Sequence, residues 1–271
     1  MIEPINLRPT ARRACVAWGA MDLTIVGCSG SYPGPDSAAS CYLVVAEGFR
    51  LLLDLGNGAL GALQRYADPG DIDAVCLSHL HADHCLDMCS YQVFRTYHPA
   101  GPLGKIPVYG PAGTARRLDR AAQAGTGPGS DGAMAASFEF TTLSAGTREI
   151  GPFTVTAEHV NHPVETFGFR IEHGGRTVAY SADTGPSDAL VRLAAGADVL
   201  LCEASFTSGH GLPADLHLTA GQAAEHAARA DVGQLILTHL VPWSNQDLVL
   251  HEAAAAYHGP LSLARPGVRI R

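Results

Sequence analysis

The sequence is poor in positive charge, in long apolar runs and in paired cysteines. It contains one lysine, and its 18 Lys+Arg stand against 26 Asp+Glu, for a net charge of −8. Because nucleic-acid affinity comes mostly from Lys and Arg neutralising phosphates, this balance argues against a protein that grips a large polyanion. No apolar run approaches the ~18 residues that a membrane helix needs, so we expect no membrane partner.

Seven cysteines are scattered at positions 15, 28, 41, 76, 85, 89 and 202. An odd number without paired spacing fits reduced thiols better than a disulfide framework. Residues 1–20 do not resemble a secretory signal either, since the apolar piece after Arg13 is short and contains Trp18 and Gly19. We therefore predict a cytoplasmic protein.

An apolar fraction of 46% over 271 residues is enough for a sizeable core. Short apolar runs bounded by Gly, Asp or Pro predict strands at residues 22–27, 41–46, 49–55, 73–78, 105–109, 153–159, 167–172, 176–181, 198–203 and 233–238. Helices are predicted at residues 58–67, 114–124, 186–195, 219–230 and 245–257, with Thr219 as an N-cap and Pro186 in a first turn. Early hairpins and later helices between strands predict an α/β class with mixed sheets.

We expect one domain over residues 21–271, preceded by an N-terminal extension at residues 1–20 without a fixed fold. The Gly-, Ala- and Ser-rich stretch 125–137 predicts a mobile loop. The candidate ligands described below come from both sides of this stretch, so it does not divide the chain into two domains.

Thirteen histidines are many for this length, and four potential metal ligands gather at one strand end. The predicted strand 73–78 runs directly into His79, His81, Asp83 and His84. A polar loop opening a helix, with Asp83 as its cap, is the alternative explanation. Alternating His and Asp side chains have no comparable structural use, whereas imidazole and carboxylate are metal ligands, so the pattern favours a metal site.

This HxHxDH pattern after a hydrophobic strand resembles that of the metallo-β-lactamase superfamily, and the resemblance extends over nearly the whole chain from Met21. Asp54 in the run 51–56 is similar to the family's first motif, whose Asp supports the metal loop. The later motifs are matched by His162, Asp183 and His239. The resemblance implies an αββα fold, in which two mixed β-sheets are sandwiched between helices.

The resemblance also implies two divalent metal ions at one edge of the sheets. The first ion would be held by His79, His81 and His162, the second by Asp83, His84 and His239, and Asp183 would bridge them. His159 competes with His162, but the spacing of His162 to Gly168 matches the family better. Three imidazoles with a bridging carboxylate suit Zn²⁺, and Mn²⁺ is the alternative.

Glu203 and His217 resemble the Glu and His of the ribonuclease Z branch, where the carboxylate orients an imidazole that donates a proton to the leaving oxygen. We therefore predict catalytic roles for Asp83, Glu203 and His217. The alternative is a buried salt bridge at Glu203 and a helix cap at His217. In this branch a metal-bridging hydroxide attacks phosphorus.

Ribonuclease Z carries a long arm between the third and fourth motifs that grips tRNA. Here only 20 residues separate His162 from Asp183, which is too few for two strands and an arm. Runs 27–31, 162–168 and 202–205 look most like the actinobacterial atypical cyclic-nucleotide phosphodiesterases. That resemblance implies hydrolysis of 3′,5′-cyclic nucleotides, above all cyclic AMP, to 5′-nucleotides.

Two rival enzyme classes remain. A ribonuclease Z-type tRNA 3′-endonuclease would need a basic face, which could only be gathered from Arg116, Arg117, Arg120 and Arg170, so tRNA is disfavoured as a partner. A lactone or thioester hydrolase would use the same metals on a carbonyl carbon. Dimerisation is common in this branch, which makes a homodimer a candidate assembly.

Several aromatic residues follow the metal-bearing segments and could stack on a base. They are Tyr91, Phe94, Tyr97, Phe206 and Trp243, and we assign none of them to a site, because each is more often a core residue.

Overall fold

The computed structural model describes residues 21–122, 132–209, 212–213 and 215–271. The predicted extension 1–20 lies outside them. One sheet runs in the order β15-β1-β3-β4-β5-β6-β7, with β2 paired to β1. Its strands are β1 (Asp22–Ser29), β2 (Ala38–Ala39), β3 (Cys41–Ala46), β4 (Phe49–Leu53), β5 (Ala74–Cys76), β6 (Ile106–Gly110), β7 (Phe138–Thr142) and β15 (Arg269–Ile270).

A second sheet runs in the order β14-β13-β12-β11-β10-β9-β8. Its strands are β8 (Gly146–Ile150), β9 (Phe153–His159), β10 (Phe167–His173), β11 (Arg176–Tyr180), β12 (Val199–Glu203), β13 (Leu235–Thr238) and β14 (Leu261–Leu263). Both sheets are mixed, as predicted. Strands β4 to β7 are mutually parallel, and so are β11 to β14. The pairs β1-β3 and β3-β4 and the strands β8 to β11 are antiparallel, and the short β2 is parallel to β1.

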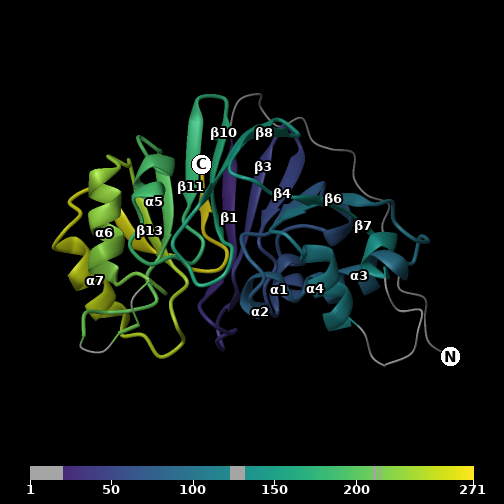
Figure 1. The fold of residues 1–271 in the computed structure, drawn as a ribbon, viewed down its shortest axis with the longest axis horizontal. Helices are drawn as coiled ribbons and strands as arrows, with labels where there is room; N and C mark the ends of the chain where they lie inside the picture. Colours follow the sequence, from purple (N-terminus) through teal and green to yellow (C-terminus); the bar gives the residue numbers. More distant parts are fainter. Residues whose placement is uncertain (1–20, 123–131, 210–211, 214) are drawn as a thin grey trace.

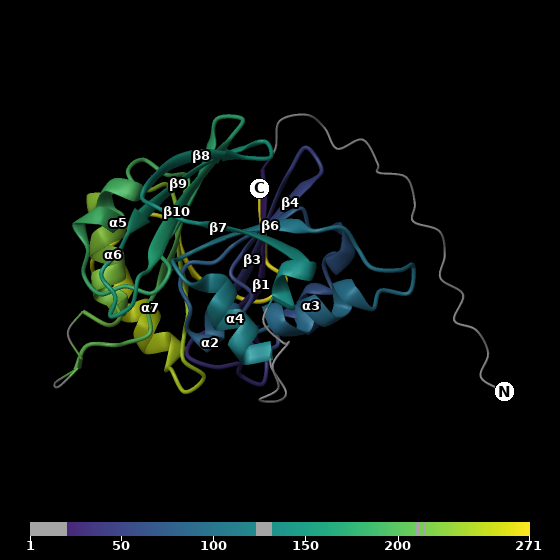
Figure 2. The same cartoon turned by 45° about the vertical axis from the view of Figure 1, so that its right-hand side comes forward.

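Helices cover the outer face of each sheet (Figure 1). The first group comprises α1 (Ala59–Leu63), α2 (Ala82–Cys85), α3 (Met88–Thr96) and α4 (Thr114–Ala122), with the 3₁₀ turns η1 (Pro69–Asp71) and η2 (Met134–Ala136). The second group comprises α5 (Asp188–Leu193), α6 (Ala220–Arg229) and α7 (Gln246–Ala254). In the turned view of Figure 2, α3 of the first group and α5 and α6 of the second lie on opposite sides of the strands.

Three apolar clusters hold these four layers together. The central one joins the facing sides of the two sheets, for example Tyr42 and Leu53 of the first sheet with Phe169 and Leu201 of the second. Each outer cluster joins a sheet to its own helices. Burial of apolar faces on both sides of each sheet is what makes the αββα order stable, and the predicted metallo-β-lactamase architecture is confirmed.

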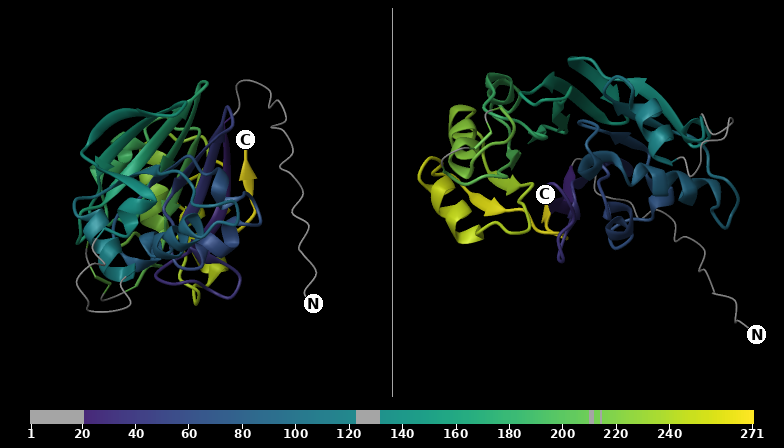
Figure 3. Two further views of the ribbon diagram at one scale, coloured as in Figure 1. Left: turned by 90° about the vertical axis from the view of Figure 1, so that its right-hand side faces the viewer. Right: turned by 60° about the horizontal axis from the view of Figure 1, so that its bottom comes forward.

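The parallel strands of both sheets end at the same edge of the sandwich. The carboxyl ends of β5, β11, β12 and β13 all meet there, and the loops that leave them carry polar side chains. This edge lies at the bottom of Figure 1 and faces the viewer in the right-hand panel of Figure 3. Loops at the carboxyl ends of parallel strands are free to supply functional groups, because the strand hydrogen bonds already fix their starting points.

Several predicted elements are confirmed and several were missed. Strands 41–46 and 153–159 are found as predicted, and Thr219 caps α6 in a capping box with Gln222. The prediction for α5 was wrong at its start, because the cap is Ser187 and Pro186 precedes it. Residues 125–131 of the predicted mobile loop 125–137 lie outside the described part, and η2 near its end buries Met134.

The six cysteines in the described ranges, at positions 28, 41, 76, 85, 89 and 202, are free thiols, as expected. The longest described helix is α6, with 10 residues. Within the described ranges no helix combines the length and the apolar character that a bilayer crossing requires.

Candidate metal centre

All seven predicted metal ligands converge at the carboxyl edge of the strands. His79, His81, His162 and Asp183 form one cluster, and Asp83, His84, Asp183 and His239 form a second, with the candidate ligand atoms in each cluster within 4.8 Å of one another. Asp183 belongs to both. The competing residue His159 ends β9, and its ring packs on Phe167 at 4.3 Å between centroids, so it does not join either cluster.

Buried hydrogen bonds set the orientation of the His79 and His84 rings. Asp54 accepts from the Ser78 amide at 2.7 Å, and from the Ser78 hydroxyl and His84 Nδ1 at 2.8 Å each. Since the Ser78 hydroxyl donates to Asp54, it can only accept from His79 Nδ1, which lies 3.0 Å away. Both rings therefore carry a proton on Nδ1 and turn Nε2 toward the clusters.

His162 and His239 are oriented in the same way from other loops. His162 Nδ1 donates to the Leu216 carbonyl at 2.9 Å. His239 Nδ1 lies 2.8 Å from the Ser205 hydroxyl, which itself donates to Glu203. Both histidines thus present Nε2 to the centre, whereas His81 presents Nδ1, which lies 3.3 Å from His162 Nε2.

Burial and mutual charge set the protonation of these groups. Burial lowers the pKa of His79, His81 and His162, which keeps the rings neutral and able to ligate. Burial disfavours the charged form of Asp183, yet the neighbouring His239 and His84 outweigh it and hold its pKa well below the usual range. His84 differs, because Asp183 and Asp54 outweigh its burial and raise its pKa well above the usual range, so a metal ion would have to displace its Nε2 proton.

The donor set fits divalent metal ions. Asp183 Oδ1 is buried without a hydrogen-bond partner, although an orphaned buried carboxylate oxygen is costly. Asp54, Asp83 and Asp183 are all buried, and their ion-pair partners in the described ranges are histidines alone. Cations between these carboxylates and the Nε2 atoms would satisfy both the orphaned oxygen and the uncompensated charge.

Glu203 and His217 adjoin both clusters. His217 Nδ1 donates to Glu203 Oε1 at 2.8 Å, and Glu203 is fully buried at the end of β12. The His217 ring lies 5.7 Å from that of His162 and 5.4 Å from that of His239, between centroids. Burial disfavours the charged form of His217, but the hydrogen bond and charge of Glu203 outweigh it and raise its pKa.

Asn161 ties three of the site loops together, which sequence reasoning missed. Its side-chain amide donates to Asp215 Oδ1 at 2.8 Å, and its carbonyl accepts from the Gly185 amide at 2.7 Å. A Cβ on Gly185 would lie 2.5 Å from the Asp215 Cα, so only glycine permits this approach. The loops that carry His162, Asp183 and His217 are therefore held in one fixed relation.

The support that Tyr180 gives to Asp54, and the backbone strain at the site, were also missed. The Tyr180 hydroxyl donates to Asp54 at 2.8 Å. Asp54, Ala182 and His239 have positive φ angles of 59°, 53° and 54°, which non-glycine residues adopt at a cost. Such strain is typical of functional sites, but no signal in the sequence pointed to it.

Comparison with known proteins places the chain in a family. The family model described as "Beta-lactamase superfamily domain" matches residues 50–240. An uncharacterized protein of Mycobacterium tuberculosis is 45% identical over 252 residues, which cover 91% of this chain and 92% of the relative. A ribonuclease Z of Mycolicibacterium gilvum is 34% identical over 247 residues, covering 82% and 85% of the two chains.

The probable metallo-hydrolase YhfI of Bacillus subtilis links sequence and structure. It is 30% identical over 261 residues, covering 91% of this chain and 98% of the relative. Its crystal structure superposes with a TM-score of 0.81 and covers 92% of this chain and 98% of that one. This chain therefore belongs to the metallo-β-lactamase superfamily, in its ribonuclease Z-like branch, and is a metal-dependent hydrolase.

Proposed function

We propose that the protein is a dinuclear phosphodiesterase that hydrolyses a small phosphodiester, 3′,5′-cyclic AMP above all, to the 5′-nucleotide. His79, His81 and His162 would hold one divalent ion, Asp83, His84 and His239 the second, and Asp183 both. Zn²⁺ suits this imidazole-rich set, with Mn²⁺ as the alternative. Two such ions side by side supply an activated water and offset negative charge at phosphorus.

The hydrogen bond between Glu203 and His217 is the observation that carries the proposal. A phosphodiester releases a poor leaving group, an alkoxide, which needs a proton as its bond to phosphorus breaks. With Nδ1 held by Glu203 at 2.8 Å, the protonated His217 ring can give its Nε2 proton to that oxygen. The leaving 3′-oxygen then departs as a hydroxyl, and the phosphate remains on the 5′-oxygen.

The shape and charge of the molecule favour a small substrate over tRNA. The strands β10 and β11 are joined by the turn Gly174-Gly175, so no arm lies between the third and fourth motifs. Arg170 donates to the Leu193 and Ala195 carbonyls beside α5, whereas Arg116, Arg117 and Arg120 lie on α4 across the sandwich. These four arginines therefore form no single basic face, and the net charge is −8.

A tRNA 3′-endonuclease is the second candidate, because a relative named ribonuclease Z is 34% identical to this chain. The test is to reconstitute purified protein with Zn²⁺ or Mn²⁺ and offer it cyclic AMP, a tRNA precursor and a homoserine lactone in parallel. We expect 5′-AMP to form and the other two substrates to remain. Cleavage of the tRNA precursor or the lactone, with cyclic AMP left intact, would overturn the proposal.

A further inference from the structure

Two exposed aromatic side chains from distant parts of the chain contact each other. Tyr32 and Trp243 are 46% and 69% exposed, and their ring centroids lie 5.7 Å apart with the planes tilted by 39°. In the described ranges only one other aromatic side chain, Tyr97, is exposed to this degree. A large ring left in water costs free energy, and two that gather at one place indicate a surface that receives a ligand.

The two loops that carry this pair are fastened to His239. Ser29 and Leu240 form an isolated parallel β-bridge, and the Gly30 amide donates to the Leu240 carbonyl at 3.0 Å. The Ser31 amide lies 3.4 Å from His239 Nε2, the nitrogen that faces the metal centre. Tyr32 is the next residue along the chain, and Trp243 follows His239 by four positions. The aromatic pair therefore stands beside the metal centre, on its His239 side.

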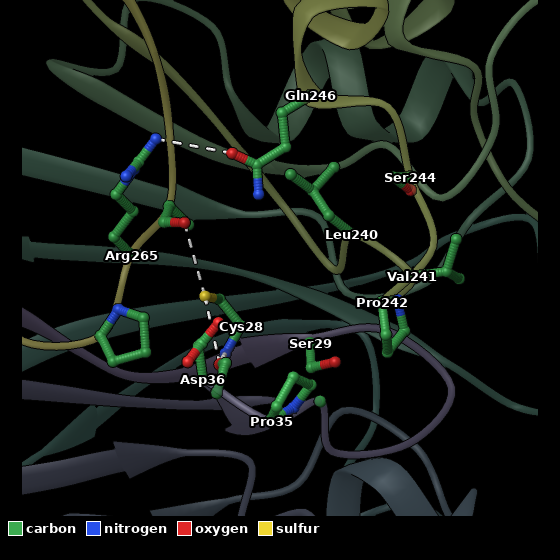
Figure 4. A pocket seen from close by; sticks show the side chains of 14 residues that line it. Cys28, Ser29, Pro35, Asp36, Leu240, Val241, Pro242, Ser244, Gln246 and Arg265 are labelled. Carbon is green, nitrogen blue, oxygen red and sulfur yellow. Dashed lines mark hydrogen bonds between the residues drawn. The ribbon is translucent and has the colours of Figure 1, made fainter.

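A hollow of about 380 Å³ lies between the same two loops (Figure 4). The two aromatic rings do not line this hollow, but Pro242 and Ser244, the chain neighbours of Trp243, do. Gln246 and Arg265 face it from another side. Arg265 reaches Gln246 with one hydrogen bond of 3.5 Å and forms no ion pair with a described residue. Amide and guanidinium donors are the groups that read the edge of a nucleobase, and the volume lies in the range of small-molecule sites.

We propose that Tyr32 and Trp243 form the base subsite of the enzyme, where the purine of the phosphodiester stacks on the Trp243 ring. Gln246 and Arg265 then face the edge of the purine from the hollow. This inference rests on the proposed function, which puts the phosphate of the same substrate at the metal centre. Aromatic stacking holds any purine by its face, so the pair sets affinity for nucleotides over phosphodiesters without a base.

The kinetic test compares Trp243→Ala with wild type on cyclic AMP and on ribose 3′,5′-cyclic phosphate, which has no base and no other aromatic ring. We expect kcat/KM for cyclic AMP, divided by that for the base-free substrate, to fall about five- to tenfold, chiefly through KM. Trp243→Phe, which keeps a ring, should restore most of the loss. Tyr97→Ala is the matched control, because it removes an aromatic ring that is 79% exposed elsewhere, and it should leave the ratio unchanged.

A binding test separates this inference from the proposed function. The sequence has two tryptophans, so in a Trp18→Phe background the fluorescence reports Trp243 alone. We expect 5′-AMP to quench it at lower concentration than ribose 5-phosphate does. Equal responses to the two ligands, or an unchanged kinetic ratio, would overturn the base subsite. Should cyclic AMP resist hydrolysis while 5′-AMP still quenches selectively, the proposed substrate fails and the subsite stands.

Discussion

Asp54→Asn should lower the affinity for the second metal ion, the one that His84 would help to hold, without disturbing the backbone. Asp54 sits at the end of β4 with φ of 59°, a conformation that Asn also tolerates, so the change adds no backbone strain. The carboxylate accepts four buried hydrogen bonds, one at Oδ1 from the Ser78 amide and three at Oδ2 from the Ser78 hydroxyl, His84 and Tyr180. The substitution therefore acts on the support of His84 rather than on a ligand.

The magnitude follows from those contacts. An amide has one oxygen, so its NH₂ group must face at least one of the four donors, whichever way it is turned. Losing one bond to a charged group should lower the free energy of unfolding by about 2 kcal/mol, or roughly 4–8 °C in the melting temperature of a chain of this size. Loss of a carboxylate behind a metal-binding histidine typically weakens metal affinity by about 10- to 100-fold.

Two measurements on metal-free protein check this prediction. Titration with Zn²⁺ against a competing chelator gives the affinity of each site, and thermal unfolding gives the change in stability. Asp188→Asn is the control, because Asp188 pairs with Arg229 at the surface and should affect neither site. Wild-type affinity at both sites in Asp54→Asn would refute the reasoning that Asp54 orients His84.

Three further predictions concern the ligands and the proton donor. Asp183→Ala should lose most bound metal and all activity, because this residue serves both clusters, and near-normal turnover would contradict a dinuclear centre. His162→Ala should lower the metal content measured by mass spectrometry, whereas His159→Ala should not. Glu203→Gln should lower the pKa of His217, since Glu203 raises it, and so move the alkaline limb of the kcat/KM profile to lower pH. An unmoved limb would argue against His217 as the acid.

The elements that the sequence did not predict have a common physical origin. Five strands were missed: β7, β8, β14 and β15 are the four edges of the two sheets, and the two-residue β2 pairs only with β1. Edge strands have a neighbour on one side only, so they are short or polar and lack the buried apolar run that marks an interior strand. The missed helix α3 is poor in strong helix formers, and tertiary contacts hold it instead. Met88 and Tyr91 pack in the apolar cluster with the first sheet, and Arg95 donates to the Tyr91 hydroxyl and the Gly104 carbonyl.

The sequence by itself indicated the interior strands and the cluster His79 to His84 from local pattern, and its resemblance to the superfamily implied the αββα order and the remaining candidate ligands. Interior strands carry continuous apolar runs, and His79 to His84 lie within six positions, so local pattern was enough to find them. The tertiary structure alone decided which nitrogen each histidine presents, that Asn161 joins three loops, and that Tyr32 meets Trp243 across 211 positions. Those features depend on contacts between loops that are far apart in the sequence. Packing of the two sheets brings these loops together, and no local sequence pattern encodes such contacts.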